Sequence, residues 1–304
     1  METGRRCILC DSPGPFESIF ERDGYRLVRC PRCRLVFQDP QPGDEALARS
    51  YYHDPAFAEA LAGELRPLAL AAARRKLVAL GADLPAAGGR ALDVGCSSGA
   101  WLEVAAEAGL SATGVEIGAA TAAAARSRGL DVRTGTLTQA LPGLEGRKFD
   151  LISFWDVLEH LRDPRLELGL ARELLAPGGA IAATFPNVEG LYPSLTHRLL
   201  ARRTGVWEHP ELPVHMFDFA PATARRLFER SGFELRRAET HAIPYDYFRS
   251  TSLAPESTGG RRGLPLRFAF AALRAVAYPL ARLTDRGNAL FVLAVPAAGR
   301  DRPA

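Results

Sequence analysis

The chain has 304 residues, of which 47% are hydrophobic and 24% are charged, with a formal net charge of +3 at pH 7. This length allows one large α/β domain and a smaller unit, and the composition is that of a globular protein and excludes general disorder. The small net charge does not by itself indicate a nucleic-acid-binding protein. No apolar run resembles a signal peptide or reaches the ~18 residues of a spanning helix, so we expect a cytoplasmic protein.

Four of the five cysteines form two Cys-x-x-Cys pairs, Cys7 with Cys10 and Cys30 with Cys33. This spacing is typical of a structural zinc site with four thiolate ligands, which leaves no coordination position for a reacting water. Disulfides are the alternative, but they are rare in the cytosol. We therefore predict a zinc ribbon with structural Zn²⁺ over residues 1–42. Residues 43–85, rich in Ala, Leu and Arg, are predicted to form a helical linker or cap.

A glycine-rich loop follows a short apolar strand over residues 90–94. Gly95 and Gly99 lie in this loop, and a helix is predicted from Ala100. Glycine is required where the backbone takes positive φ angles or closely approaches a ligand. A second strand, over residues 111–116, ends on Glu116, and an acid at this place in a nucleotide-binding βαβ unit accepts hydrogen bonds from the ribose hydroxyls. The loop lacks the glycine patterns of NAD and ATP sites, which points away from both ligands.

Further strands are predicted at 149–154, 180–185, 233–241 and 288–295, with a Leu-Ala-Pro-Gly-Gly helix end at 175–179. Between Arg90 and Phe233 this order of motifs resembles the class I S-adenosylmethionine (SAM)-dependent methyltransferases. The segment from Cys30 to Pro42 is similar to that of bacterial methyltransferases with an N-terminal zinc ribbon, found in polysaccharide and natural-product gene clusters.

The resemblance implies an α/β fold over residues 86–304: a doubly wound, mainly parallel, Rossmann-like sheet of seven strands that binds SAM. Gly135-Thr136-Leu137 stands where family members often carry an acid near the adenine, which is a departure from the family pattern. A small side chain suits the crowded loop at Cys96, so packing explains it better than nucleophilic chemistry. The expected cofactor-binding residues are Asp93, Gly95, Cys96, Gly99, Glu116, Thr136 and Trp155.

The stretch after the 149–154 strand carries three side chains that can bind metals or transfer protons. On a helix, Asp156, Glu159 and His160 would share one face, where they could hold a divalent cation or supply a general base. The arrangement is similar to the Glu-x-x-Glu-His metal motif of ubiquinone-pathway O-methyltransferases and small-RNA 2′-O-methyltransferases, with Asp156 replacing the first Glu. The alternative is that the Glu-His pair shapes the cofactor pocket without a metal.

Residues 187–219 form a long connection, rich in aromatic and histidine side chains, that we predict to be a substrate lid. Within it, His215 resembles a histidine that metal-using relatives place opposite the Glu-His pair. We predict that His160 and His215 are the catalytic acid/base pair, since a neutral imidazole can accept a hydroxyl proton. The alternative is that His215 packs at the entry of the next helix.

A helical insertion is predicted over residues 257–285, and its apolar part either packs on the domain or lies in a membrane interface. The second alternative would allow peripheral contact with the inner face of the membrane and a lipid-linked substrate. We predict methyl transfer from SAM to a small-molecule, sugar or lipid-linked glycan acceptor, at a hydroxyl. The alternatives are an RNA methyltransferase whose ribbon recognises RNA, although nucleic acid is the less favoured partner, and a non-enzymatic SAM-binding protein.

Overall fold

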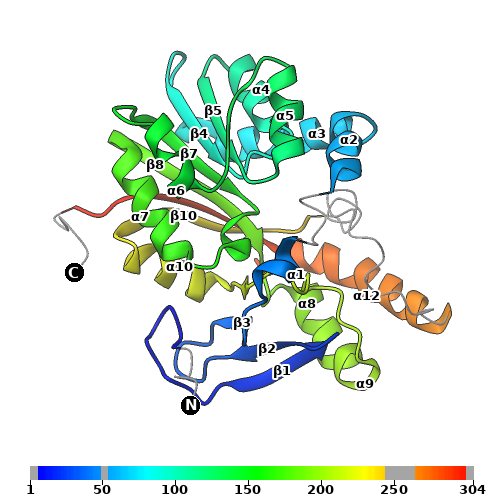
Figure 1. Cartoon of the computed structure of the whole chain (residues 1–304). Helices are drawn as coiled ribbons and strands as arrows, with labels where there is room; N and C mark the ends of the chain where they lie inside the picture. The colour runs from blue at the N-terminus through cyan, green and yellow to red at the C-terminus, as the bar shows by residue number, and fades with distance from the viewer. Residues whose placement is uncertain (1–5, 49–53, 244–263, 299–304) are drawn as a thin grey trace.

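A computed structural model describes residues 6–48, 54–243 and 264–298 (Figure 1). Its main feature is a seven-stranded sheet with helices on both faces, and a four-stranded sheet lies against it at the N-terminal end of the chain. The predicted fold class is therefore confirmed.

The large sheet has the strand order β10-β11-β8-β7-β4-β5-β6. Five neighbouring strands are parallel, whereas β11 runs antiparallel to both β8 and β10. The strand order reverses between β4 and β7, and ligands of open α/β sheets bind at the carboxyl ends of the strands at such a point. The strands are β4 (Arg90–Val94), β5 (Ser111–Glu116), β6 (Asp131–Thr134), β7 (Phe149–Trp155), β8 (Leu175–Pro186), β10 (Phe233–His241) and β11 (Ala289–Pro296).

The strand predictions differ from the structure at β6, for which no range was predicted, and at β8, which begins at Leu175 and not at residue 180. The Leu-Ala-Pro-Gly-Gly stretch was expected to close the preceding helix, but its first residue already pairs with Phe149 of β7. The register shifts within this pairing, so the two glycines lie inside an irregular strand start.

Helices cover both faces of the large sheet, and alternate residues of β7 contact the two layers. Ile152 and Phe154 are buried in one apolar cluster with residues of α6, α7 and α10, while Leu151 and Trp155 are buried in a second cluster with α3, α4 and α5. This alternation follows from the two-residue period of a strand. The helices are α3 (Arg66–Leu80), α4 (Ala100–Glu107), α5 (Ala119–Ser127), α6 (Leu137–Ala140), α7 (Pro164–Leu174) and α10 (Pro221–Arg230).

The described part of the predicted helical linker contains three α-helices, α1 (Asp44–Ala48), α2 (Pro55–Ala62) and α3, and a 3₁₀ turn over Gly81–Asp83. Pro55 favours the start of α2, because its fixed φ suits the first helical turn and Asp54 caps the helix by accepting a hydrogen bond from the Ala56 amide. Residues 49–53 of the linker lie outside the described residues.

The small sheet joins the N-terminal segment to a distant part of the chain. Its strands are β1 (Glu17–Arg22), β2 (Tyr25–Arg29), β3 (Val36–Gln38) and β9 (Phe217–Asp218), in that order. β9 pairs antiparallel with β3, so the predicted ribbon gains its fourth strand from the segment 187–219. Phe37 of β3 and Phe154 of β7 belong to the same buried cluster, so the two sheets share one hydrophobic core.

The predicted lid, residues 187–219, contains α8 (Leu191–Thr196), a helical turn over His197–Ala201, α9 (Arg202–Thr204) and β9. Trp207 is buried and packs edge-to-face on Phe20 of β1. Tyr192 of α8 stacks on Tyr278, which lies in α12 (Leu264–Leu283). This segment therefore packs between the ribbon and α12.

The predicted insertion at 257–285 corresponds to α12, and its first part, 257–263, lies outside the described residues. Within the part of the chain that the structure describes, no helix has the length and apolar character needed to cross a bilayer.

Candidate functional site

The glycine loop connects β4 to α4 at the carboxyl edge of the sheet. Gly95 and Gly99 have φ angles of +73° and +81°, which strain any other residue. A Cβ on Gly95 would lie 2.5 Å from a methyl carbon of Val157, and one on Gly99 would overlap Leu130. The amides of Gly95 and Cys96 donate to the carbonyl of Val115, at 2.8 and 3.0 Å. The loop is thus held against β5 in a conformation that needs both glycines.

Glu116 ends β5 next to this loop and is nearly buried. Its carboxylate accepts hydrogen bonds from the amides of Ser97 (2.8 Å) and Gly118 (2.7 Å). Burial raises the pKa of Glu116, while these amide bonds act in the opposite direction. The geometry brings the predicted ribose acid and the loop to the same edge of the sheet.

Cys96 is a residue of this loop, and its thiol fills the space over Gly114. A Cβ on Gly114 would overlap the sulfur, and burial raises the pKa of the thiol well above its usual value. A protonated, buried thiol is a packing group and a poor nucleophile.

Asp93 is buried at the end of β4 and accepts a hydrogen bond of 2.6 Å from the Ser153 hydroxyl. Burial raises its pKa to about 7, against the opposing effects of Ser153 and the Lys76 ammonium. Lys76 of α3 was not singled out from the sequence. Its ammonium lies 3.3 Å from Asp156 and 5.4 Å from the centre of the Trp155 ring, so it adds a positive charge at this edge.

Two predicted cofactor residues have structural roles of their own. Trp155 is buried, with its ring centre 5.9 Å from that of Trp101 and 6.5 Å from that of Phe291. Thr136 caps α6: its hydroxyl accepts from the Gln139 amide and its amide donates to the Gln139 side chain. The neighbouring Gly135 amide donates to the Glu116 carbonyl, which places Thr136 beside the predicted ribose site.

The expectation that Asp156, Glu159 and His160 share a helix face is wrong. Asp156 has a φ of +59°, and the chain then makes a short 3₁₀ turn over residues 158–160, so the i, i+3, i+4 geometry of an α-helix is absent. The Asp156 carboxylate accepts from the Thr184 hydroxyl and pairs with Lys76. Asp156 is therefore not among the side chains that the structure groups as possible ligands with Glu159 and His160.

The structure instead brings Glu159 and His160 together with His215. One possible ligand atom from each of these three side chains lies within 4.8 Å of the others, and the two imidazole ring centres are 4.6 Å apart. The residues predicted as an acid/base pair are therefore neighbours, although their positions in the sequence are 55 apart.

The electrostatics of this group favour the uncharged forms of its side chains. Among the described residues, neither carboxylate oxygen of Glu159 has a hydrogen-bond partner, although the side chain is buried, and burial with the nearby Asp156 raises its pKa. Burial, with a smaller effect of His215, lowers the pKa of His160 to about 3, and burial lowers that of His215 to about 4. Such imidazoles are weak bases at neutral pH, but the neutral form is the one that binds metals. A buried carboxylate without a partner, beside two neutral imidazoles, fits a divalent cation.

The imidazole of His160 is oriented by a backbone group. Its Nδ1 lies 3.1 Å from the Val214 carbonyl oxygen, which can only accept, so Nδ1 carries the proton and Nε2 carries the lone pair. Metal-binding histidines commonly have their other nitrogen fixed in this way.

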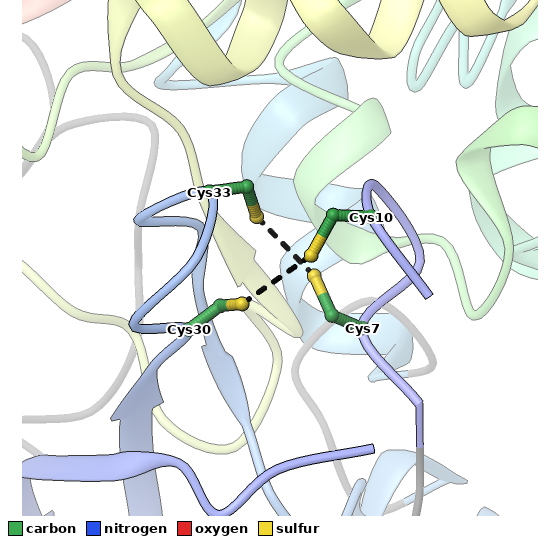
Figure 2. A group of neighbouring side chains, drawn as sticks. All are labelled: Cys7, Cys10, Cys30 and Cys33. Atoms are coloured by element: carbon green, nitrogen blue, oxygen red, sulfur yellow. Dashed lines mark hydrogen bonds between the residues drawn. The ribbon is translucent and has the colours of Figure 1, made fainter. Parts of the chain in front are cut away.

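The four thiols of the ribbon converge on one point (Figure 2). The sulfurs of Cys7 and Cys33 are 3.4 Å apart and those of Cys10 and Cys30 are 3.5 Å apart, far longer than the ~2.05 Å of a disulfide. Sulfurs bound tetrahedrally to zinc at ~2.3 Å would lie slightly farther apart, at about 3.8 Å. The donor set and spacing fit structural Zn²⁺.

The parallel sheet, the glycine loop and the acid at the end of β5 together define a Rossmann-like protein that binds a nucleoside-containing cofactor. A family model described as "Methyltransferase domain" matches residues 63–238. Since this is more than half of the chain, the chain belongs to that family.

Similar curated proteins are named as O-methyltransferases. The ubiquinone biosynthesis O-methyltransferase of Ruegeria pomeroyi is 29% identical over 165 residues, 51% of this chain and 66% of that protein. The protein of the same name from Pseudomonas paraeruginosa is 36% identical over 101 residues, 31% of this chain and 43% of that protein. The chain thus spans two thirds or less of the lengths of these relatives.

Solved structures support the fold. Magnesium protoporphyrin IX methyltransferase from Synechocystis PCC 6803, with bound S-adenosylhomocysteine (SAH), has a TM-score of 0.54 and 15% identity, covering 84% of this chain and 100% of that one. A SAM-dependent methyltransferase from Archaeoglobus fulgidus has a TM-score of 0.50 and 22% identity, covering 75% and 93%. The prediction of a class I SAM-dependent methyltransferase is confirmed by the family and the fold.

Proposed function

We propose that the chain transfers the SAM methyl group to a hydroxyl of a small-molecule, sugar or lipid-linked glycan acceptor. The observation that carries this proposal is the position of Glu159, His160 and His215 at the cofactor edge, with Val157 of the same turn packed against Gly95. Relatives named as O-methyltransferases support a hydroxyl acceptor.

In this proposal the sulfonium of SAM supplies an electrophilic methyl group, and the chain has to orient the reactants and manage one proton. The glycine loop accommodates the methionine end of the cofactor, and Glu116 accepts hydrogen bonds from the ribose. Glu159, His160 and His215 would hold a divalent cation, whose chemistry would be to favour the ionised form of the acceptor hydroxyl, with its proton released to solvent. Asp93 and Lys76 set the charge beneath the cofactor.

The RNA alternative would be supported by a basic surface that joins the ribbon to the cofactor edge. A cleft of about 660 Å³ does carry four arginines, between the ribbon and α10. It lies near Phe233 and Ala297, at the end of the sheet opposite the glycine loop. A phosphate bound there would not lie near the methyl group, so we favour the small-molecule or glycan acceptor. The arginines are Arg32, Arg225, Arg226 and Arg230.

The cofactor site is tested by calorimetric titration with SAH. We expect saturable binding that Glu116→Gln weakens roughly 10- to 100-fold, because hydrogen bonds to a charged group contribute about 1.5–3 kcal/mol. Glu107→Gln, a change on the exposed face of α4, is the matched control and should leave the affinity unchanged. Failure of the intact protein to bind SAH would overturn the methyltransferase proposal.

The cation site is tested with Mn²⁺ and electron paramagnetic resonance. We expect Glu159→Gln to weaken Mn²⁺ binding at least tenfold, since it removes the one carboxylate of the group. Asp156→Asn should have a small effect, because that side chain binds Thr184 and Lys76 instead. Equal affinity in wild type and Glu159→Gln would contradict the cation site and leave the cofactor result untouched.

A further inference from the structure

Among its described residues, the predicted zinc ribbon has one fully buried polar side chain at its contact with the 213–216 segment: Gln38, the last residue of β3. Its side-chain amide donates to the carbonyl of Pro213 (2.7 Å) and to that of His215 (2.5 Å). Its backbone amide donates to the carbonyl of Met216 at 2.9 Å. One ribbon residue therefore binds three backbone carbonyls around His215.

The same segment is fixed from the opposite side by the turn that follows β7. The Met216 amide donates to the Glu159 carbonyl at 2.7 Å, and Nδ1 of His160 donates to the Val214 carbonyl at 3.1 Å. Residues 213–216 are thus held between the ribbon and the Glu159–His160 turn.

The His215 side chain has weaker restraints of its own. Its Nε2 lies 3.6 Å from a Glu211 oxygen, and its Nδ1 has no hydrogen-bond partner among the described residues. The position of the ring next to His160 therefore depends on the backbone that carries it.

From these contacts we propose that Gln38 is a positioning residue for His215, and that the zinc-bound ribbon keeps the Glu159–His160–His215 group assembled. This proposal rests on the proposed function of that group. In this proposal the ribbon helps to form the methyl-transfer site, because it donates hydrogen bonds to the backbone around His215, one of the candidate cation ligands.

The zinc knuckles set the place of Gln38. Gln38 pairs with Leu27 of β2, three residues before Cys30, and β3 begins three residues after Cys33. The Cys30 amide donates to the Leu35 carbonyl, which closes the knuckle onto the start of β3. Four Zn–S bonds would fix this turn relative to the Cys7–Cys10 knuckle.

The cofactor loop is held by other contacts. Gly95 and Cys96 donate to Val115 of β5, and Ser97 donates to Glu116. Loosening of the ribbon should therefore disturb the histidine group while SAH binding persists.

The test combines hydrogen exchange with histidine NMR on the full-length, zinc-loaded protein. Gln38→Met keeps the side-chain length and removes the amide group that donates both side-chain hydrogen bonds. We expect at least tenfold faster amide exchange over residues 213–217 and shifted ¹⁵N imidazole resonances of His160 and His215. Zinc content and the SAH dissociation constant should stay within about twofold of wild type.

Gln41→Met is the matched control, because Gln41 also donates to a backbone carbonyl across this contact, that of Arg162, but at an exposed site. It should leave exchange and imidazole resonances unchanged. Wild-type exchange and imidazole resonances in folded Gln38→Met would overturn the proposal.

If Gln38→Met does not fold, wild-type protein treated with a thiol reagent and chelator to remove zinc serves instead. We expect faster exchange at 213–217 than at the cofactor loop, 93–101. Equal change at both places, or none at 213–217, would overturn the proposal. Absence of SAH binding by wild type would contradict the proposed function and is measured separately.

Discussion

Asp93 combines near-complete burial with a single side-chain hydrogen-bond donor, Ser153, and the charges that face it are Lys76 and Glu116. Its pKa is raised from 3.8 to about 7, so the folded protein disfavours the ionised form. The stabilising contribution of the protonated carboxyl is complete below pH ~3.8 and is lost as the pH rises through 7.

Asp93→Asn should therefore gain stability relative to wild type as the pH rises. Between pH 5 and pH 8 we expect the difference in unfolding free energy to grow by ~2–3 kcal/mol, at about 1.4 kcal/mol per pH unit below the folded pKa. Thermal unfolding of the SAH-free protein at both pH values measures it. Asp44→Asn, at a side chain that is 95% exposed, is the control. If the difference in unfolding free energy between wild type and Asp93→Asn stays constant from pH 5 to pH 8, Asp93 is ionised in the folded protein.

At the scale of elements, the conformation of the β4–α4 loop requires that residue 95 has no Cβ. Gly95→Ala adds a Cβ that approaches Val157 and strains a positive φ, so we expect lower melting temperature and at least tenfold weaker SAH binding. Gly88→Ala has the same kind of φ (+87°) with no heavy atom within 4 Å of the added Cβ. It should cost ~1–2 kcal/mol of stability and leave SAH binding unchanged.

A second substitution separates the two effects of Gly95→Ala, the collision of the added Cβ with Val157 and the strain of the positive φ angle. Val157→Ala in the Gly95→Ala background opens the space and should recover part of the lost affinity. If the double variant binds SAH no better than Gly95→Ala, the Val157 contact does not explain the loss.

At the scale of the whole molecule, α12 lies at the periphery, beside α8 (Figure 1). Phe268 is 67% exposed and Leu283 82% exposed, and the charged residues of the helix are all arginines. Exposed arginines at 198, 202 and 203 lie on the neighbouring α8–α9 segment. Exposed apolar side chains with flanking positive charges suit an anionic membrane surface. Contact with such a surface fits the lipid-linked glycan among the proposed acceptors.

We expect the protein to sediment with vesicles containing phosphatidylglycerol and to lose most of that binding in Phe268→Asp and Leu283→Asp. Val78→Asp, at a side chain of α3 that is 78% exposed, is the control for added charge. If these variants bind vesicles like wild type, α12 is not the contact. If the protein dimerises through α12 instead, ultracentrifugation will show it.

The sequence was sufficient to predict those parts of the fold and of the site whose contacts are local. The β4 strand, Gly95, Gly99 and Glu116 follow from strand length, glycine spacing and the position of an acid, and all lie at one edge as expected. Asp156 was misplaced because helical spacing does not reveal its positive φ.

Distant contacts could not be predicted in this way. The hydrogen bond from Gln38 to His215 and the position of the Lys76 charge over Trp155 join segments whose approach is decided by tertiary packing. The grouping of His215 with His160 was expected from resemblance to a family and not from spacing.

The pairing of β3 with β9 also has a consequence for how the chain is made. About 180 residues separate Gln38 from Phe217, and at ~5–20 residues per second a ribosome needs roughly 10–40 s to synthesise them. Throughout that interval the nascent ribbon has an open strand edge, which is a template for pairing with other chains. β9, the fourth strand of the small sheet, is synthesised only after β4 to β8 of the large sheet.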